Sequence, residues 1–343
     1  MSQSCVIGVD LGGTNVRARA YFEDGSAASE RFSNPSRAQE GTRAILEAIV
    51  LTVRAVQASA SVPVDRIGIA VPGHIDGRNG VVIWAPNFGE TKDGIFLNWR
   101  HVPMAAPLEQ ELGVKVELGN DANLAALGEY RFGVGKKQAK CLVLLTIGTG
   151  IGGGVVMAPE AVHGDARGPL LLVGANGGGA ELGHTIVQHG GNDCRAGSYG
   201  ALEAYCQRDA IVDRAVHRLS RGRASALRDL VGGDLAKVTP ALISEAANLG
   251  DEMCLEVWDE VGTWLGVGIG SLINVFAPDV FAIGGQIAKA GEPLLGAAKR
   301  TARNIAIPSL FEDCRIVQAM QIEDGGILGA AALALEARQW KTS

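Results

Sequence analysis

The sequence lacks the features that mark membrane, secreted and nucleic-acid-binding proteins. No apolar run reaches the about 18 uncharged residues that a membrane span needs. Residues 1–10 enter an apolar, strand-like stretch without the basic and apolar regions of a signal peptide. A formal net charge of −6 provides no positive field for a phosphate backbone. We therefore expect a cytoplasmic protein with no membrane and no nucleic acid among its partners.

Disulfides are also not expected, although the chain has six cysteines. They are scattered along a chain that is long enough to bury a hydrophobic core, so reduced thiols are expected. Glycine is the residue in excess, since 47 of 343 residues is about twice the roughly 7% of an average chain. The backbone must therefore turn tightly or approach other groups closely at many points.

The order of apolar patterns predicts an α/β protein with two lobes. Strands are expected at 5–10, 16–22, 28–32, 66–71 and 114–118, and helices at 37–60, 107–112 and 120–131. Residues 141–146 and 151–157 repeat the strand–glycine–strand pattern of the start, which indicates an internal duplication. Later segments are mainly helical, at 201–219, 240–249, 252–276 and 327–338, with a strand at 280–283. We place the smaller lobe at 1–119 plus about 326–343, and the larger lobe at 120–325.

The first candidate site is the hexapeptide 10–15, Asp-Leu-Gly-Gly-Thr-Asn, at the end of the first strand. Paired glycines allow backbone N–H groups to close around phosphate oxygens, and an acid at the strand end can hold Mg²⁺ through water. An ordinary hairpin turn explains the same residues. This motif alone leaves both interpretations open.

A second glycine loop, at 146–154, satisfies the pattern G-x-G-x-x-G through Gly148, Gly150 and Gly153. A dinucleotide-binding loop of this pattern opens a helix and is followed about 20 residues later by an acid. Here the chain continues as a strand and then a proline, so the context argues against a dehydrogenase. Two strand–glycine–strand loops facing each other would instead hold a nucleoside triphosphate from both sides.

Two polar clusters carry candidate catalytic and binding groups. Asn120 and Asp121 open a predicted helix, where one of them can serve as a cap worth about 1 kcal/mol. Asp121 can also accept a proton from a substrate hydroxyl, as kinase reactions need. Glu181, His184 and Glu203 suit the hydroxyls of a sugar, although an isolated Glu-x-x-His is more often a surface pair.

Taken in this order, the segments resemble the ROK (repressor, open reading frame, kinase) family of sugar kinases over essentially the whole chain. The resemblance implies an actin-like ATPase (ribonuclease H-like) fold, with two α/β lobes around an interdomain cleft. It implies an ATP-dependent hexose kinase that transfers the γ-phosphate of MgATP to a sugar hydroxyl, with the 6-hydroxyl of glucose expected first. A homodimer is expected from the same resemblance.

The resemblance also assigns roles to individual residues. The implied ATP-binding residues are Asp10, Gly12, Gly13, Thr14, Thr149, Gly150, Gly152, Gly284 and Gly285, with Asp10 also holding Mg²⁺ through water. The implied sugar-binding residues are Gly73, Asn87, Asn120, Asp121, Glu181, His184 and Glu203. Asp121 is the implied catalytic base.

The chain departs from the family pattern where many ROK proteins hold a structural zinc with one His and three Cys. Ala196 and Ala201 stand where the second and third cysteines are expected. Only His184 and Cys194 remain in register, so we expect no structural zinc. Two apparent insertions, at 89–98 and 158–172, fall where they can border the sugar.

Two other functions are compatible with parts of the pattern. A ROK-type sugar-sensing repressor carries a helix-turn-helix before the first phosphate loop, and only nine residues precede Asp10, so we expect none here. A sugar-binding protein without catalysis has no use for Asp121 and both glycine loops. The sugar stays open among glucose, mannose, fructose, allose and N-acetylated amino sugars, as does the use of polyphosphate in place of ATP.

Overall fold

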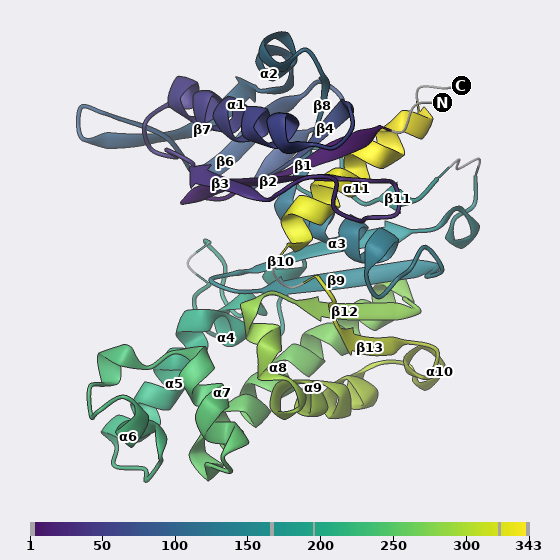
Figure 1. The fold of residues 1–343 in the computed structure, drawn as a ribbon. Coiled ribbons are helices and arrows are strands. Elements are labelled where there is room, and N and C mark those ends of the chain that lie inside the picture. Colours follow the sequence, from purple (N-terminus) through teal and green to yellow (C-terminus); the bar gives the residue numbers. More distant parts are fainter. Residues whose placement is uncertain (1–3, 165–167, 195, 322–323, 341–343) are drawn as a thin grey trace. The chain divides into compact units, whose positions relative to one another are not determined.

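The computed structural model describes residues 4–164, 168–194, 196–321 and 324–340, and the chain forms two compact units (Figure 1). The first unit comprises Met1–Gln138, Gly154–Ala180 and Asp324–Ser343, and the second comprises Ala139–Gly153 and Glu181–Glu323. The expected domain boundary after residue 119 remains a prediction. In the structure the strand and the helix on either side of it, β8 (Lys115–Asn120) and α3 (Asp121–Phe132), both belong to the first unit.

The first unit is built on a five-stranded sheet with the order β3-β2-β1-β4-β8. The other strands of this sheet are β1 (Cys5–Leu11), β2 (Asn15–Tyr21), β3 (Phe32–Pro35) and β4 (Val64–Val71). β1, β2 and β3 form an antiparallel meander, and β4 and β8 run parallel to β1. The third strand begins later than expected, because the Ser29 hydroxyl accepts the Ala20 N–H and takes the place of a backbone ladder bond.

A smaller antiparallel sheet in the first unit contains β5 (His74–Asp76), β6 (Val81–Lys92) and β7 (Ile95–Pro103). The hairpin of β6 and β7 accounts for the apparent insertion at 89–98. Phe88 and Trp99 of this hairpin are buried and pack at a ring-centroid distance of 5.4 Å. These two rings flank the insertion and anchor it to the core, whereas Ile95 and Leu97 within it are exposed.

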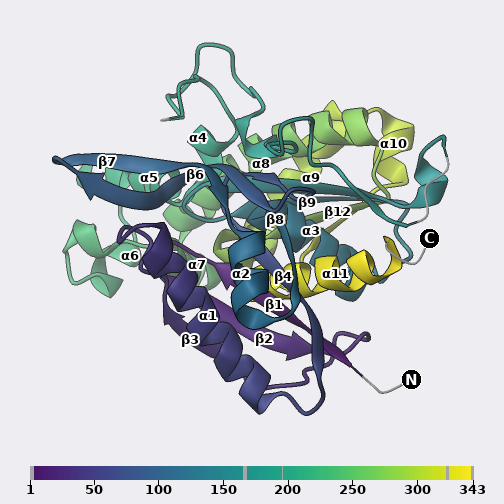
Figure 2. The same cartoon turned by 90° about the horizontal axis from the view of Figure 1, so that it is seen from above.

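Helices cover both faces of the five-stranded sheet. In β1 the side chains of Cys5, Ile7, Val9 and Leu11 join the core under α1 (Thr42–Ser59) and α2 (Ala105–Leu112). Figure 2 looks down on these two helices with the strands beneath them. The alternate residue Val6 packs with the opposite layer, which includes α11 (Gly325–Trp340). The alternation of side chains along the strand thus separates two cores.

Helix α11 lies very close to the sheet. A Cβ atom at Gly68 of β4 would fall 1.9 Å from the Ala330 carbonyl oxygen, and one at Gly8 of β1 would fall 2.0 Å from the Ile327 oxygen. No other residue type allows this approach, because any side chain on the strand would displace the helix. The buried ion pair between Arg131 of α3 and Glu336 then joins the two helices of this layer.

The second five-stranded sheet repeats the strand order of the first, as β11-β10-β9-β12-β13. Its strands are β9 (Cys141–Ile147), β10 (Ile151–Met157), β11 (Leu170–Leu171), β12 (Val280–Gly284) and β13 (Arg315–Gln318). β9 and β10 correspond to β1 and β2, and β12 runs parallel to β9 as β4 does to β1. The predicted duplication is confirmed, and β10 runs from the second unit into the first after Gly153.

The rest of the second unit is mainly helical, as predicted. Its α-helices are α4 (Glu203–Cys206), α5 (Arg208–Ser220), α6 (Leu227–Leu230), α7 (Pro240–Asn248), α8 (Glu252–Phe276), α9 (Glu292–Ile305) and α10 (Pro308–Glu312). Short 3-10 helices occur at η2 (Leu182–His184), η3 (Leu235–Lys237) and η4 (Gln286–Ala290), and another, η1 (Pro159–Ala161), lies in the first unit. The single helix expected at 201–219 is wrong in one respect, because Gln207 adopts an extended conformation and separates α4 from α5.

None of the helices in the described part of the chain is both long and apolar enough to cross a membrane.

Candidate functional site

Several predicted site residues of the first unit lie at one edge of its sheet. β1, β4 and β8 are neighbouring parallel strands, with Asp10 opposite Ala70 and Val71 opposite Asn120. The carboxyl ends of parallel strands meet at the same edge, and ligands of α/β proteins bind there. Asp10 and Asn120 are therefore brought to the same edge from segments far apart in the sequence.

At the start of α3, the residue that caps the helix is not the residue predicted to be the base. The side-chain oxygen of Asn120 accepts the Asn123 N–H at 3.0 Å, which is the hydrogen bond of an N-cap. Its amide nitrogen donates to the Gly73 carbonyl at 3.0 Å, so Gly73 joins this group. Asp121 is the first helical residue and accepts the Ala122 N–H at 2.9 Å. Since Asn120 caps the helix, capping does not explain why an aspartate stands at position 121.

The first glycine loop is a tight turn between β1 and β2. The Gly12 N–H donates to the Asn15 carbonyl at 2.9 Å, and the Thr14 carbonyl accepts the Ser36 N–H at 2.9 Å. Gly13 and Thr14, between these bonds, are exposed. Such a turn presents backbone N–H groups outward, as phosphate binding needs.

The carboxyl group of Asp10 holds its proton more strongly than an exposed aspartic acid does. Burial is the main cause, the negative charges of Asp121 and Asp324 add to it, and Arg17 opposes it, so the pKa of Asp10 rises to about 6. The pKa of Asp121 is also raised, by burial, although the backbone N–H groups of Ala122 and of Asp121 itself lower it. This edge of the sheet therefore concentrates negative charge in a partly buried place.

That concentration of charge fits a divalent cation. Carboxylate oxygens are the ligands that Mg²⁺ prefers, and a nearby cation offsets the repulsion between the acids. Asp10 lies where the predicted Mg²⁺ contact through water requires an acid, at the end of β1 beside the first glycine loop. The residues present therefore fit the metal ion that accompanies ATP.

The start of α11 adds a group that the sequence interpretation missed. A Cβ atom at Gly326 would lie 3.0 Å from Cγ of Asp10, so the first turn of α11 lies against this carboxylate. The N-terminus of a helix favours negative charge, which makes it a suitable neighbour for Asp10 or for a phosphate. The sequence signal was a further glycine pair, Gly325–Gly326, directly after Asp324.

The second glycine loop connects β9 to β10 in the second unit. The Gly148 N–H donates to the Gly150 carbonyl at 2.9 Å, and the Gly148 carbonyl accepts the Arg208 N–H at 2.9 Å. β12 pairs with β9 so that Gly284 lies opposite Thr146, which brings Gly284 and Gly285 to the loop. The implied ATP-binding residues of this unit, Thr149, Gly150, Gly152, Gly284 and Gly285, thus gather around one strand edge.

Ile151 links this loop to the predicted sugar-binding residues of the same unit. Its N–H donates to Oε2 of Glu203 at 2.6 Å. A Cβ atom at Gly183 would lie 2.2 Å from the Ile151 carbonyl oxygen, so η2, between Glu181 and His184, packs directly on the loop. Gly150 is equally confined, since a Cβ atom there would lie 2.6 Å from Oε2 of Glu203. The predicted ATP-binding loop and the predicted sugar-binding residues of this unit are therefore in direct contact.

The predicted site residues therefore form two groups, one on each unit. Asn87 is set apart within the first unit, because it is exposed on β6 and its N–H donates to Oδ1 of Asn98 at 3.1 Å. Glu181 and His184 belong to the second unit, which resumes at Glu181 directly after the Gly154–Ala180 part of the first unit. The assignment of sugar-binding and ATP-binding roles to these residues stays a prediction.

The segment that aligns with the family's zinc site does not fit that metal. The Cys194 thiol lies 3.0 Å from the Ser198 hydroxyl, and Ala201 is fully buried. Within the described residues, no three His, Cys, Asp or Glu side chains come together as metal ligands. A tetrahedral zinc site requires four such donors.

The duplicated sheets with a glycine loop on each define an α/β protein of the actin-like ATPase class. A ROK family glucokinase from Streptomyces griseus, solved in complex with glucose and AMPPNP, has a TM-score of 0.77 and 32% identity, covering 97% of this chain and 99% of that one. The fold class expected from the sequence is confirmed.

The particular family follows from sequence comparison. A model of the ROK family matches residues 6–337. A glucokinase from Thermotoga maritima is 35% identical over 96% of this chain and 97% of its own length. A xylose repressor from Caldicellulosiruptor bescii is 26% identical over 96% of this chain and 78% of its own length. The chain belongs to the ROK family.

The contact between Glu203 and Ile151 predicts that Glu203→Gln raises KM for both the sugar and ATP. The neutral side chain weakens a charge-assisted hydrogen bond to the glycine loop, so KM should rise about tenfold for the sugar and several-fold for ATP. Steady-state kinetics in both substrates provide the measurement, with Glu312→Gln on an exposed helix end as the control. An unchanged KM for ATP would show that Glu203 does not act on the loop.

The raised pKa of Asp10 predicts a stability difference that depends on pH. In the ligand-free protein the folded state binds the Asp10 proton more tightly than the unfolded state does. Its contribution to stability is therefore present below about pH 4 and is lost as pH rises through about 6. Asp10→Asn should accordingly be more stable than the natural chain at pH 8, by about 1–3 kcal/mol, with the gain vanishing near pH 4.

Urea unfolding between pH 4 and pH 8 measures this difference. Asp24→Asn is the matched control, because hydrogen bonds from the Ser26 side chain and backbone lower the pKa of this exposed acid. The control should therefore not gain stability as pH rises. A pH-independent effect of Asp10→Asn would contradict the charge repulsion described here.

Proposed function

We propose that this chain transfers the γ-phosphate of MgATP to the 6-hydroxyl of glucose, with Asp121 as the general base. At the coarser level the chain is an ATP-dependent sugar kinase of the ROK family, which follows from its similarity to glucokinases over nearly its whole length. The choice of glucose rests on those relatives. The role of Asp121 rests on the geometry of this chain.

One observation carries the assignment of Asp121. Its neighbour Asn120 makes the capping hydrogen bond of α3, so the carboxylate of Asp121 remains at the sheet edge beside Asp10 and the first glycine loop. Phosphoryl transfer to an alcohol needs a carboxylate that orients the hydroxyl and accepts its proton. Burial raises the pKa of Asp121, which makes it a stronger proton acceptor, and the N–H groups at the helix N-terminus oppose that rise and favour the ionised form that a base needs.

In this proposal each group of residues has a defined task. Backbone N–H groups of the glycine loops bind the phosphates of ATP, and Asp10 would hold a Mg²⁺ ion, whose charge would offset that of the phosphates. Glu181, His184 and Glu203 bind sugar hydroxyls. Asp121 takes the proton of the attacking hydroxyl while its oxygen forms a bond to the γ-phosphorus and the bond to ADP breaks. Catalysis is then mainly positioning and charge stabilisation.

Within the second unit, the shared contact at Ile151 supports cooperation between the substrates. Glu203 contacts the glycine loop through the Ile151 N–H, so a sugar that binds Glu203 also acts on the loop that binds phosphate. Such a link favours closure of this glycine loop on ATP when the sugar is present. It thereby reduces transfer of the γ-phosphate to water. Low ATPase activity without sugar is the expected consequence.

A sugar-responsive regulator is the second candidate, because the relatives include a xylose repressor. A regulator needs sugar binding but no phosphoryl transfer. Turnover therefore separates the two functions.

The experiment is ADP release with MgATP against glucose, mannose, fructose, allose and N-acetylated amino sugars. We expect the highest kcat/KM with glucose, and a phosphorylated product at the 6-position by mass spectrometry and NMR. Sugar binding by calorimetry without turnover of any sugar would favour the regulator. Preference for another sugar would leave the kinase in place and change its substrate.

Asp121→Asn provides the test of the base. The substitution keeps the shape of the side chain but cannot accept the proton, so kcat should fall by about 100-fold or more. The melting temperature should change little. Asp93→Asn is the control, because this exposed residue in the β6–β7 turn has φ of 51°, a conformation that asparagine adopts readily. Full activity of Asp121→Asn would exclude this residue as the base.

A further inference from the structure

A backbone hydrogen bond joins the two ends of the loop between two predicted sugar-binding residues. This loop, residues 185–202, follows His184 and precedes Glu203. The Leu202 N–H donates to the Thr185 carbonyl at 2.9 Å and joins the two ends. Any displacement of the loop is therefore transmitted to the residues on either side of that bond.

Backbone hydrogen bonds organise the described part of this loop. The Gly200 carbonyl accepts the N–H groups of Val187 at 2.8 Å and Gln188 at 3.2 Å, and the Gly200 N–H donates to the Asn192 carbonyl at 2.7 Å. Farther out, the Cys194 N–H donates to the Ser198 carbonyl at 3.1 Å. These bonds are made in the segment where the resemblance implied zinc ligands and where the residues present do not fit a metal.

Tyr205 of α4 attaches this loop to the rest of the unit. Its side chain is buried, with 5% of its surface exposed, and its hydroxyl accepts the Asn192 N–H at 2.9 Å. Its ring stacks on Trp264 of α8 with a centroid distance of 4.3 Å and an interplanar angle of 27°. The hydroxyl is thus a polar group held by a buried ring, and it contacts the middle of the loop.

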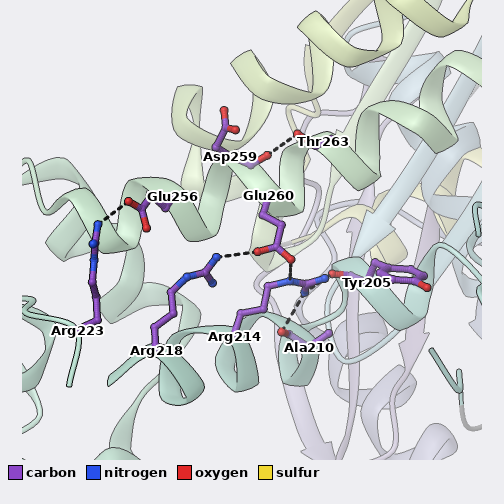
Figure 3. A network of polar contacts seen from close by, with 9 residues as sticks. All are labelled: Tyr205, Ala210, Arg214, Arg218, Arg223, Glu256, Asp259, Glu260 and Thr263. Carbon is purple, nitrogen blue, oxygen red and sulfur yellow. Dashed lines mark hydrogen bonds and ion pairs between the residues drawn. The ribbon is translucent and has the colours of Figure 1, made fainter. Parts of the chain in front are cut away.

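The backbone of Tyr205 is fixed by an ion-pair network between α5 and α8 (Figure 3). Arg214 donates to the Tyr205 carbonyl at 2.7 Å and to the Ala210 carbonyl at 3.0 Å, and its Nε donates to Glu260 at 2.8 Å. Arg218 donates to the other oxygen of Glu260 at 2.8 Å. Both the ring and the backbone of Tyr205 are therefore anchored before its hydroxyl reaches the loop.

We propose that Tyr205 is a positioning residue that fixes the described residues of the loop 185–202, and through them His184 and Glu203, without a metal ion. The inference rests on the proposed function, in which those two residues bind the sugar. Tyr205 touches neither substrate. It acts through the Asn192 hydrogen bond and through its position in α4, two residues after Glu203.

The first test is Tyr205→Phe, which removes the hydroxyl and keeps the stacked ring. KM for the sugar should rise about fivefold, as expected for the loss of one neutral hydrogen bond, while kcat and KM for ATP stay within twofold. Tyr199→Phe is the matched control, because this residue lies on the same loop, is 62% exposed, and its hydroxyl makes no hydrogen bond within the described part of the chain. The control should match the natural chain. Equal KM values in all three proteins would overturn the proposal.

Hydrogen exchange keeps this test independent of the proposed function. The amide of Asn192 should exchange faster in Tyr205→Phe than in Tyr199→Phe, whether or not the chain turns over glucose. Turnover by the natural chain tests the kinase assignment separately. Unchanged exchange at Asn192 would contradict the role of Tyr205.

A compensating pair provides a second test. A Cβ atom at Gly191 would lie 1.9 Å from the Tyr205 hydroxyl oxygen, and the next contacts are with Gln188 at 2.9 Å and 3.0 Å. Gly191→Ala should therefore raise KM for the sugar at least tenfold alone and clearly less in the Tyr205→Phe background. Additive effects would show that the hydroxyl does not occupy this position.

Metal analysis tests the remaining part of the proposal. The natural chain, purified without added zinc, should contain less than about one zinc per ten chains. Treatment with 1,10-phenanthroline should change neither its melting temperature nor its KM for the sugar. One zinc per chain, or loss of stability on chelation, would overturn the metal-free organisation of the loop.

Discussion

The close approach of α11 to the sheet of the first unit is the constraint on which the candidate catalytic edge depends. Gly8 and Gly68 leave room for the helix backbone itself, so the helix position is set by contact rather than by side-chain length. α11 also joins α3 through the buried pair of Arg131 and Glu336. The beginning of α3 carries Asp121, and the beginning of α11 reaches Asp10. One packing arrangement thus holds both acids at the end of the parallel strands.

The second sheet repeats the strand order of the first, but the polar groups near its glycine loop are different. In each unit a tight glycine turn joins the first antiparallel pair of strands, and a parallel strand brings further residues to the same edge. The first unit places acids there. The second unit places the carboxylate of Glu203 against the Ile151 N–H, where it connects the glycine loop with the predicted sugar-binding residues. The two units thus differ in where the carboxylate comes from, since Asp10 belongs to β1 and Glu203 belongs to α4.

Much of this organisation could be predicted from the sequence, because the relevant signals are local. Buried strands followed by glycine pairs identify both loops, and the polar start of the helix at 120–131 identifies Asn120 and Asp121. Which of the two caps the helix could be decided only from the structure, since either side chain satisfies the sequence pattern. The break at Gln207 was also hidden, because the apolar spacing of 201–219 continues through it and the extended residue depends on tertiary contacts.

Contacts between distant segments were beyond the sequence. Nothing local relates Gly326 to Asp10, Glu203 to Ile151, or Tyr205 to Asn192, because each pair is brought together by the packing of separate elements. The loss of two zinc ligands was visible in Ala196 and Ala201. What holds the loop in their place became apparent only from its hydrogen bonds.

The most direct measurement is a crystal structure of this chain with glucose and a nonhydrolysable ATP analogue. We expect a carboxylate oxygen of Asp121 within about 3 Å of the glucose 6-hydroxyl, and that hydroxyl facing the γ-phosphorus. Glu203 should contact both the sugar and the Ile151 N–H. A sugar whose reacting hydroxyl lies against another side chain, with Asp121 remote from it, would contradict the central claim.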